Sequence, residues 1–189
     1  MVRMEGLRLA SPARAAVVAL GNPYRGDDGV GPALLRALRS VIRDPLPVTG
    51  NPMDHGSLIT DHGLRITDYG SRLTDYDLLE SAHGGLPLAQ ALVGYQRVLG
   101  VDAAPWLPPG EVARFPLEEL PATAGYFHGL GLRAALELVA RAGGEEVPEV
   151  EILAIGIPEA PRFGEGLSPV VERALPVALK EAVRWLNEI

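Results

Sequence analysis

The amino-acid sequence predicts an α/β fold in which helices cover both faces of a mostly parallel, twisted sheet. Short apolar runs, typical of strands buried on both faces, alternate along the chain with longer amphipathic stretches. This alternation indicates repeated strand–helix units. The length of 189 residues fits one domain, because domains usually hold roughly 100–200 residues. We therefore expect a single domain over residues 1–189.

The first strand and the first helix are predicted near the amino end. The run Ala15–Leu20 (AAVVAL) is apolar and is followed by glycine, which predicts a buried strand. Apolar residues then recur at helical spacing from Val30 to Ile42. Because proline is tolerated in the first turn of a helix but not deeper, Pro32 indicates that this helix begins close to residues 28–31.

The remaining elements follow the same alternation. The last helix is expected to have Ser168 as its N-cap and to bend at Pro176. The predicted elements are a short helix over Leu86–Val93, a strand over Gln96–Val101 that ends at Asp102, a helix over Leu130–Ala142 closed by two glycines, a strand over Glu151–Gly156 and a helix from Pro169 to about Asn187.

One segment does not fit this alternation. Leu58–Leu78 (LITDHGL RITDYGS RLTDYDL) repeats every seven residues, but its glycines and threonines and the lack of a sustained apolar pair argue against a coiled coil. Its Gly, Asp and Thr content favours turns or short ribbons. We interpret about residues 49–74 as an exposed, mobile insertion in a surface loop, which chains tolerate because closure entropy rises slowly with loop length. A binding arm for a partner is the functional alternative.

Composition excludes several classes of function. The chain has no cysteine, which rules out disulfides, thiolate metal sites and a cysteine nucleophile, and fits a cytoplasmic protein. The net charge of −7 and the lack of a basic run argue against a nucleic-acid partner. No apolar run approaches the roughly 18 residues that a membrane span needs, so we expect no membrane association.

Polar residues lie at three places where the predicted sheet would bind a ligand. Asp27 and Asp28 follow the first strand, Asp102 follows a later strand, and His128 lies in the loop TAGYFHGLGL before a helix. In an open parallel sheet, ligands collect at the carboxyl ends of the strands. Two carboxylates and one imidazole from separate loops suit a divalent ion such as zinc or nickel, with positions left for water or substrate.

Each of these residues also has an ordinary interpretation. Asp27 or Asp28 could cap the following helix, although a cap needs only one of them. Asp102 could start a turn, and His128 beside Phe127 could be a partly buried histidine with satisfied hydrogen bonds. Residue types alone leave these alternatives open.

Four sequence blocks, in order, resemble the hydrogenase maturation proteases. GNPYRGDDGVGP is similar to the opening motif of that family, G-N-x-L-x-x-D-D/E-G-x-G, with Tyr24 in place of the usual Leu. The other three blocks are VLGVDAAPWLPPGEVARF, FHGLGLRAALELV and AIGIPEAPRFGEGLSPVVERALP. The resemblance covers nearly the whole chain except the predicted insertion. It also implies a strand over about Tyr76–Leu79, followed by Glu80 at the acidic position of the family's Asp-Gly-Gly turn, with the glycines later in this chain.

The resemblance implies a fold, a reaction and a set of site residues. The fold is a three-layer α/β/α sandwich. The implied reaction is removal of a carboxy-terminal peptide from the large-subunit precursor of a nickel–iron hydrogenase after nickel insertion. The residues that match the family's metal ligands and would carry the reaction are Asp28, Asp102 and His128. The metal would be the nickel of the substrate, and Asp27 would serve the helix end and the loop.

Two other functions remain open at this stage. The LGNP opening is also similar to that of peptidyl-tRNA hydrolases, although the segment that follows it in that family is absent. A metal-binding accessory or chaperone-like protein without turnover would keep the same three side chains. Cleavage of a precursor would distinguish the protease from the accessory protein.

Overall fold

The computed structural model describes residues 15–43, 76–120, 131–158 and 164–188, and these contain one five-stranded sheet. The strand order is β2-β1-β3-β5-β4, with β4 antiparallel to β5 and the other pairs parallel. The mostly parallel sheet is therefore confirmed. The strands are β1 (Ala15–Leu20), β2 (Tyr76–Ser81), β3 (Arg97–Ala104), β4 (Val112–Pro116) and β5 (Glu149–Gly156).

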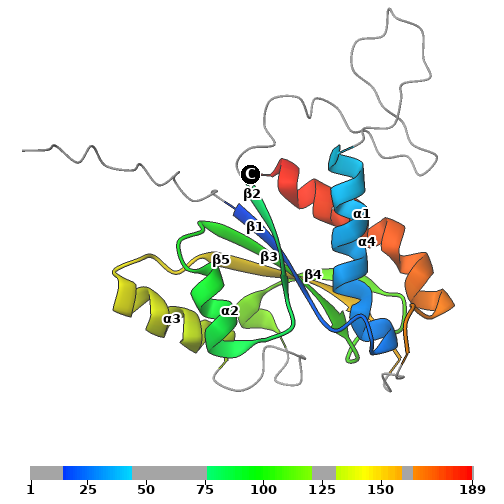
Figure 1. The fold of residues 1–189 in the computed structure, drawn as a ribbon, viewed down its shortest axis with the longest axis horizontal. Coiled ribbons are helices and arrows are strands. Elements are labelled where there is room, and N and C mark those ends of the chain that lie inside the picture. Colours follow the sequence, from blue (N-terminus) through cyan, green and yellow to red (C-terminus); the bar gives the residue numbers. More distant parts are fainter. Residues whose placement is uncertain (1–14, 44–75, 121–130, 159–163, 189) are drawn as a thin grey trace, which may run out of the picture.

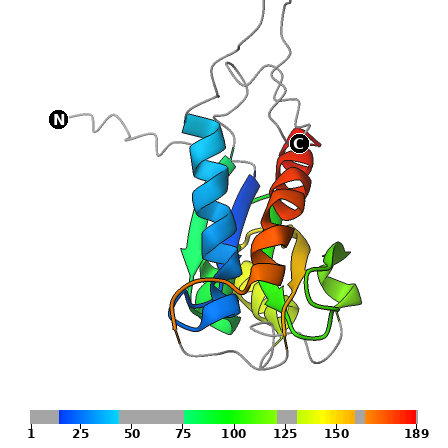
Figure 2. The same cartoon turned by 90° about the vertical axis from the view of Figure 1, so that its right-hand side faces the viewer.

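Helices cover both faces of this sheet. Helices α1 and α4 pack together on one face, and α2 and α3 pack together on the other, which gives three layers (Figures 1 and 2). The predicted α/β/α sandwich is confirmed. The helices are α1 (Val30–Arg43), α2 (Gly85–Leu92), α3 (Leu132–Gly143) and α4 (Pro169–Asn187), with short 3₁₀ turns η1 (Gly26–Gly29) and η2 (Leu117–Glu119).

Two apolar cores lie on the two sides of the sheet. Because successive side chains of a strand point to opposite faces, Val17 belongs to the core under α1 and α4, and Val18 to the core under α2 and α3. Trp185 of α4 is fully buried in the first core, and Leu136 of α3 in the second. Each such side chain contributes roughly 1.5–3 kcal/mol by leaving water.

The predicted elements agree with the structure at most of their bounds. Strand β1 and helix α4 have the predicted limits, and Pro32 lies in the first turn of α1. The prediction was wrong at the end of β3, which continues through Asp102 to Ala104 because its pairing with β5 continues to the end of both strands. Strand β4 was not predicted, since it is short, half-buried and contains an arginine and a proline.

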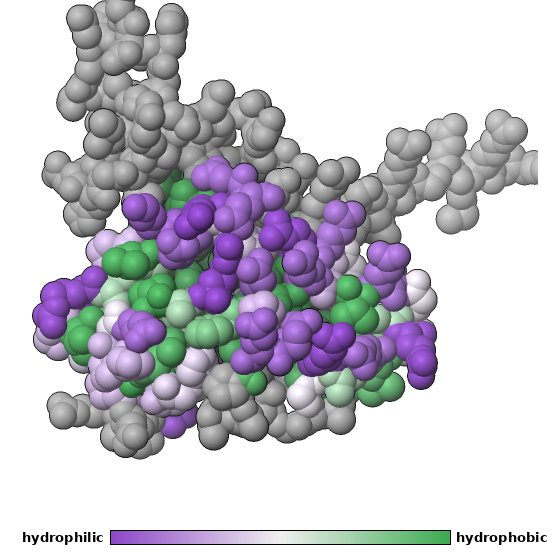
Figure 3. Space-filling view, turned by 180° about the vertical axis from the view of Figure 1, so that it is seen from behind, coloured by the Kyte–Doolittle hydropathy of each residue, from purple (hydrophilic) through white to green (hydrophobic). Residues whose placement is uncertain are grey.

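Some predictions concern residues outside those that the structure describes. The predicted insertion at about residues 49–74 and His128 both fall there. Seen from behind, the surface of the described part carries many polar side chains, with smaller apolar areas between them (Figure 3). No helix of the described part is long and apolar enough to cross a membrane.

Candidate active site

The loop that follows β1 closes tightly on itself because of one glycine. Gly21 has a φ of +116°, and a Cβ atom there would collide with the carbonyl oxygen of Asp28. The backbone of Asp28 therefore packs directly against the end of β1. The dihedral angle and the close contact both require glycine at this position.

The Asp28 carboxylate is held by the backbone of the same loop. The Asn22 N–H donates to Oδ2 of Asp28 at 3.0 Å, and Oδ1 of Asn22 accepts from the Tyr24 N–H at 2.9 Å. The Arg25 N–H also donates to the Asn22 carbonyl at 3.0 Å. Asn22 thus connects the exposed tip of the loop to the carboxylate of Asp28.

Asp27 has a different role from its neighbour. Its Oδ1 accepts from the Ser168 N–H at 2.6 Å, at the amino end of α4. This end carries partial positive charge, so the carboxylate is electrostatically stabilised there. Asp27 does serve a helix end, but the helix is α4, which lies 141 residues further along the chain. The side chain of Ser168, the predicted N-cap, makes no capping hydrogen bond.

Two backbone hydrogen bonds add to this connection. The Gly26 N–H donates to the Gly164 carbonyl at 2.8 Å, and the Gly164 N–H donates to the Tyr24 carbonyl at 3.1 Å. The loop between β1 and η1 is therefore clamped to the segment that leads into α4. We call this connection the loop clamp; it comprises these two bonds and the one from Ser168 to Asp27.

Asp102 is the only buried charged side chain among the described residues, with 4% of its surface exposed. It lies within β3, where it pairs with Ala154 of β5, and its Oδ1 accepts from the Ala103 N–H at 2.8 Å. Removing a carboxylate from water costs several kcal/mol unless partners compensate. A carboxylate buried inside a strand is uncommon, and buried ionisable groups often belong to functional sites.

The loop of Asp28 and strand β3 meet at the carboxyl end of the sheet. A Cβ atom on Gly31 would collide with the carbonyl oxygens of Leu20 in β1 and Val101 in β3, so the start of α1 lies against both strand ends. The η1 turn, which contains Asp28, also packs against β3. Among the described residues, no three His, Cys, Asp or Glu side chains form a metal-binding group, and the third predicted ligand, His128, lies outside them.

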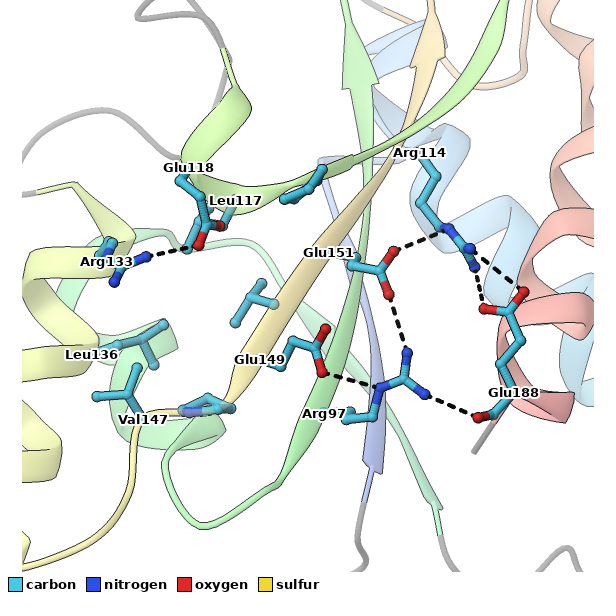
Figure 4. A pocket seen from close by; sticks show the side chains of 13 residues that line it. Arg97, Arg114, Leu117, Glu118, Arg133, Leu136, Val147, Glu149, Glu151 and Glu188 are labelled. Atoms are coloured by element: carbon cyan, nitrogen blue, oxygen red, sulfur yellow. Dashed lines mark hydrogen bonds and ion pairs between the residues drawn. The ribbon is translucent and has the colours of Figure 1, made fainter.

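The opposite end of the sheet contains a cavity of about 590 Å³ (Figure 4). Its polar lining consists of arginines and glutamates that pair with one another. Glu151 of β5 is central, because it accepts from Arg97 at 3.3 Å, from Arg114 at 3.1 Å and from the indole N–H of Trp185 at 2.8 Å. Arg114 also pairs with Glu188 at 3.0 Å.

The pKa of Arg114 reflects this pairing. Burial lowers the pKa of its guanidinium, but the hydrogen bond that it donates to Glu188 and the charges of nearby glutamates outweigh burial and raise the pKa above its ordinary value. The arginine therefore stays charged and bound to its partners. We call the set Arg97, Arg114, Glu151, Trp185 and Glu188 the amino-end network.

A family model described as hydrogenase maturation protease matches residues 69–185, which is more than half of the chain. The chain belongs to the hydrogenase maturation protease family. It is therefore a peptidase of the group that its sequence blocks resemble. The matched range includes Asp102 and begins after the loop of Asp28.

Solved structures of hydrogenase maturation proteases have the same fold. The maturating endopeptidase HybD from E. coli has a TM-score of 0.62 and 22% identity, over 93% of both chains. HybD from Thermococcus kodakarensis has a TM-score of 0.60 and 22% identity, over 92% of this chain and 99% of that one. HycI from Thermococcus kodakarensis KOD1 has a TM-score of 0.57 and 19% identity, over 94% of both chains. No curated protein sequence matches the chain.

Two features of the site differ from what the sequence indicated. The amide of Ser168 as partner of Asp27 was missed, although Ser168 itself was recognised as the start of a helix. Glu80, expected just after a strand, lies within β2 and pairs with Arg39 of α1 at 2.7 Å. This contact gives Glu80 a role in joining α1 to the edge of the sheet.

Proposed function

We propose that this peptidase removes the carboxy-terminal extension of a nickel–iron hydrogenase large-subunit precursor after nickel has been inserted. In this proposal Asp28, Asp102 and His128 hold the nickel of the precursor, which is part of the substrate. The observation that supports it most is the burial of Asp102 in β3, at the end of the sheet where the Asp28 loop packs.

The chemistry of the donors suits this role. Carboxylate oxygens and an imidazole nitrogen are ligands for borderline divalent ions such as nickel. Asp28 and Asp102 each accept a hydrogen bond from a backbone N–H group, at 3.0 Å and 2.8 Å. Such bonds fix the orientation of both carboxylates, whose oxygens are suitable ligands for a cation.

The protein's own groups would orient the substrate and move a proton. A bound cation supplies Lewis acidity, which polarises a carbonyl group or acidifies a water molecule. A carboxylate of the site can accept the proton of the attacking water, which typically contributes 10²–10⁴-fold to a rate. The loop clamp holds Asp28 in place during this process, because it fixes the loop at Tyr24, Gly26 and Asp27.

The proposal is tested by following the size of a precursor with and without nickel. The wild-type chain should shorten the nickel-loaded precursor and leave the nickel-free precursor intact. Asp28→Asn and His128→Ala should each slow processing by about a hundredfold or more, with unchanged thermal unfolding. Leu138→Ala, at an exposed position of α3, is the matched control and should process normally.

Three results would contradict the proposal. Normal processing by both site variants would show that these residues are not the site. Equal cleavage of nickel-loaded and nickel-free precursor would remove nickel from recognition. Binding of the precursor without any cleavage by the wild-type chain would favour the accessory function.

A further inference from the structure

We propose that Tyr24 is a docking residue, whose ring packs against an apolar side chain of the extended carboxy-terminal segment of the precursor, close to the bond that is cleaved. The inference rests on the proposed function, since it takes the precursor as the substrate. It goes beyond that function by naming a residue that determines affinity for the peptide and not for the metal.

The exposure of Tyr24 distinguishes it from other apolar side chains. Its surface is 66% exposed, which is the largest value among the exposed large hydrophobic residues of the described part, and it is the only aromatic residue of that group. An isolated exposed aliphatic residue is common on protein surfaces and needs no explanation. An aromatic ring in this position is more informative, because tyrosine is enriched among the residues that dominate binding energies.

The backbone that carries the ring is fixed. The Tyr24 N–H donates to Asn22 at 2.9 Å, and its carbonyl accepts from Gly164 at 3.1 Å. Gly26, two residues later, donates to the Gly164 carbonyl at 2.8 Å. The loop clamp thus holds the main chain while the side chain remains in solvent. Binding to a fixed backbone loses little conformational entropy, which favours affinity.

Tyr24 is connected to Asp28 of the candidate site through Asn22. Asn22 accepts from Tyr24 through its side chain and donates to Asp28 through its backbone N–H. The ring and the Asp28 carboxylate therefore belong to one hydrogen-bonded loop, with the ring on its outer side. In this proposal a precursor whose nickel reaches Asp28 lies over this loop, where Tyr24 is the exposed large hydrophobic side chain.

The chemistry of the ring indicates the kind of group it binds. A tyrosine offers a flat apolar surface and a hydroxyl group that both donates and accepts hydrogen bonds. The flat surface suits an apolar side chain, and the hydroxyl suits the backbone of an extended peptide. We assign the main contribution to the ring surface, because the hydroxyl of an exposed tyrosine is already solvated by water.

Steady-state processing of the nickel-loaded precursor tests this assignment with three variants. Tyr24→Ala should raise KM about tenfold or more with kcat within about twofold of wild type, because it removes binding shared by substrate and transition state. Tyr24→Phe keeps the ring and should stay within about twofold in both parameters. Leu138→Ala removes a side chain that is 55% exposed on α3 and should change neither.

The kinetic parameters of the variants decide whether the ring of Tyr24 binds the precursor. A wild-type KM for Tyr24→Ala would overturn the docking role and leave the proposed function standing. A loss confined to kcat would also overturn it, since the residue would then act on the chemical step. A similar loss in Tyr24→Phe would assign the effect to the hydroxyl and contradict the ring contact. Failure of the wild-type chain to process the precursor would refute the proposed function, and the docking role with it.

Discussion

The carboxylates at the two ends of the sheet bind different kinds of donor. At the carboxyl end, Asp27, Asp28 and Asp102 accept hydrogen bonds from backbone N–H groups. At the amino end, Glu151 and Glu188 accept from the guanidinium groups of arginines. Backbone amides bind the carboxylates at one end, whereas guanidinium groups bind them at the other.

Under the proposed function, the site does not coincide with the cavity. The cavity of about 590 Å³ lies at the amino end, where the charged lining residues are committed to one another. The carboxyl end contains the buried Asp102 and the fixed loop of Asp28 and Tyr24. Under the proposed function, the arginine–glutamate pairs stabilise the fold, and the carboxylates at the carboxyl end bind the ligand. The predictions below test this division of roles.

The largest effect on stability is expected at the centre of the amino-end network. Glu151→Ala leaves two arginines and an indole N–H without their shared acceptor, in a region where these side chains are at most about a quarter exposed. We expect the free energy of unfolding to fall by about 2–3 kcal/mol, because breaking a partly buried ion pair leaves uncompensated charge. Chemical denaturation measures this change.

A matched control is available on α3. Glu137→Ala removes a pair with Arg133 at 3.1 Å in which both side chains are 57% exposed. Solvent screens this pair, so we expect a much smaller loss than in Glu151→Ala. Equal losses in the two variants would show that the amino-end network contributes no more than a surface ion pair.

A smaller effect is expected at the loop clamp. Asp27→Ala removes the acceptor of the Ser168 N–H and should lower the free energy of unfolding by about 1 kcal/mol, as the loss of a helix cap does. It should also slow precursor processing, because the Asp28 loop loses one of its attachments. Asp27→Asn keeps an acceptor oxygen and should recover most of both losses. Identical behaviour of the two variants in unfolding and processing assays would contradict the clamp.

The smallest predicted effect is a pH-dependent change in stability at Tyr95, which lies just before β3 at the amino end of the sheet. Burial, together with the hydrogen bond and the charge of Asp77, raises the pKa of Tyr95 to about 12. A raised pKa means that the folded state favours the protonated phenol. The contribution to stability is therefore complete below about pH 10, the pKa of an unfolded tyrosine, and is lost as the pH rises towards 12. Since the pair is partly exposed, solvent screening keeps the effect below about 1 kcal/mol.

Tyr95→Phe separates this contribution from other alkaline effects. The wild-type chain should lose stability more steeply than the variant between about pH 10 and 12. Thermal unfolding across this range measures the difference. Parallel curves for the two proteins would show that the environment of Tyr95 does not favour the protonated form.

The sequence predicted those parts of the fold that depend on local pattern. Strand β1 is a continuous apolar run and α4 begins with proline, so both were predicted at their observed limits. Strand β4 could not be recognised, because its pairing with β5 decides its structure and its side chains are only half-buried. The end of β3 was misplaced because a carboxylate is rarely buried inside a strand.

The site was predictable in part. Order along the chain and strand topology indicated that the Asp28 loop and Asp102 share one end of the sheet, and the structure places them there. The contact between Asp27 and Ser168 joins residues 141 positions apart and depends on how α4 packs beside α1, which no local pattern contains. The convergence with His128 stays a prediction.

The most direct test compares nearly isosteric substitutions at the two ends of the sheet in one assay. Asp102→Asn and Glu151→Gln each replace a carboxylate by an amide, and both are assayed for processing of the nickel-loaded precursor at a temperature where both proteins are folded. We predict that Asp102→Asn loses about a hundredfold or more of the rate, while Glu151→Gln stays within about twofold of wild type. A wild-type rate for Asp102→Asn, or a greater loss in Glu151→Gln, would contradict the assignment of the site to the carboxyl end.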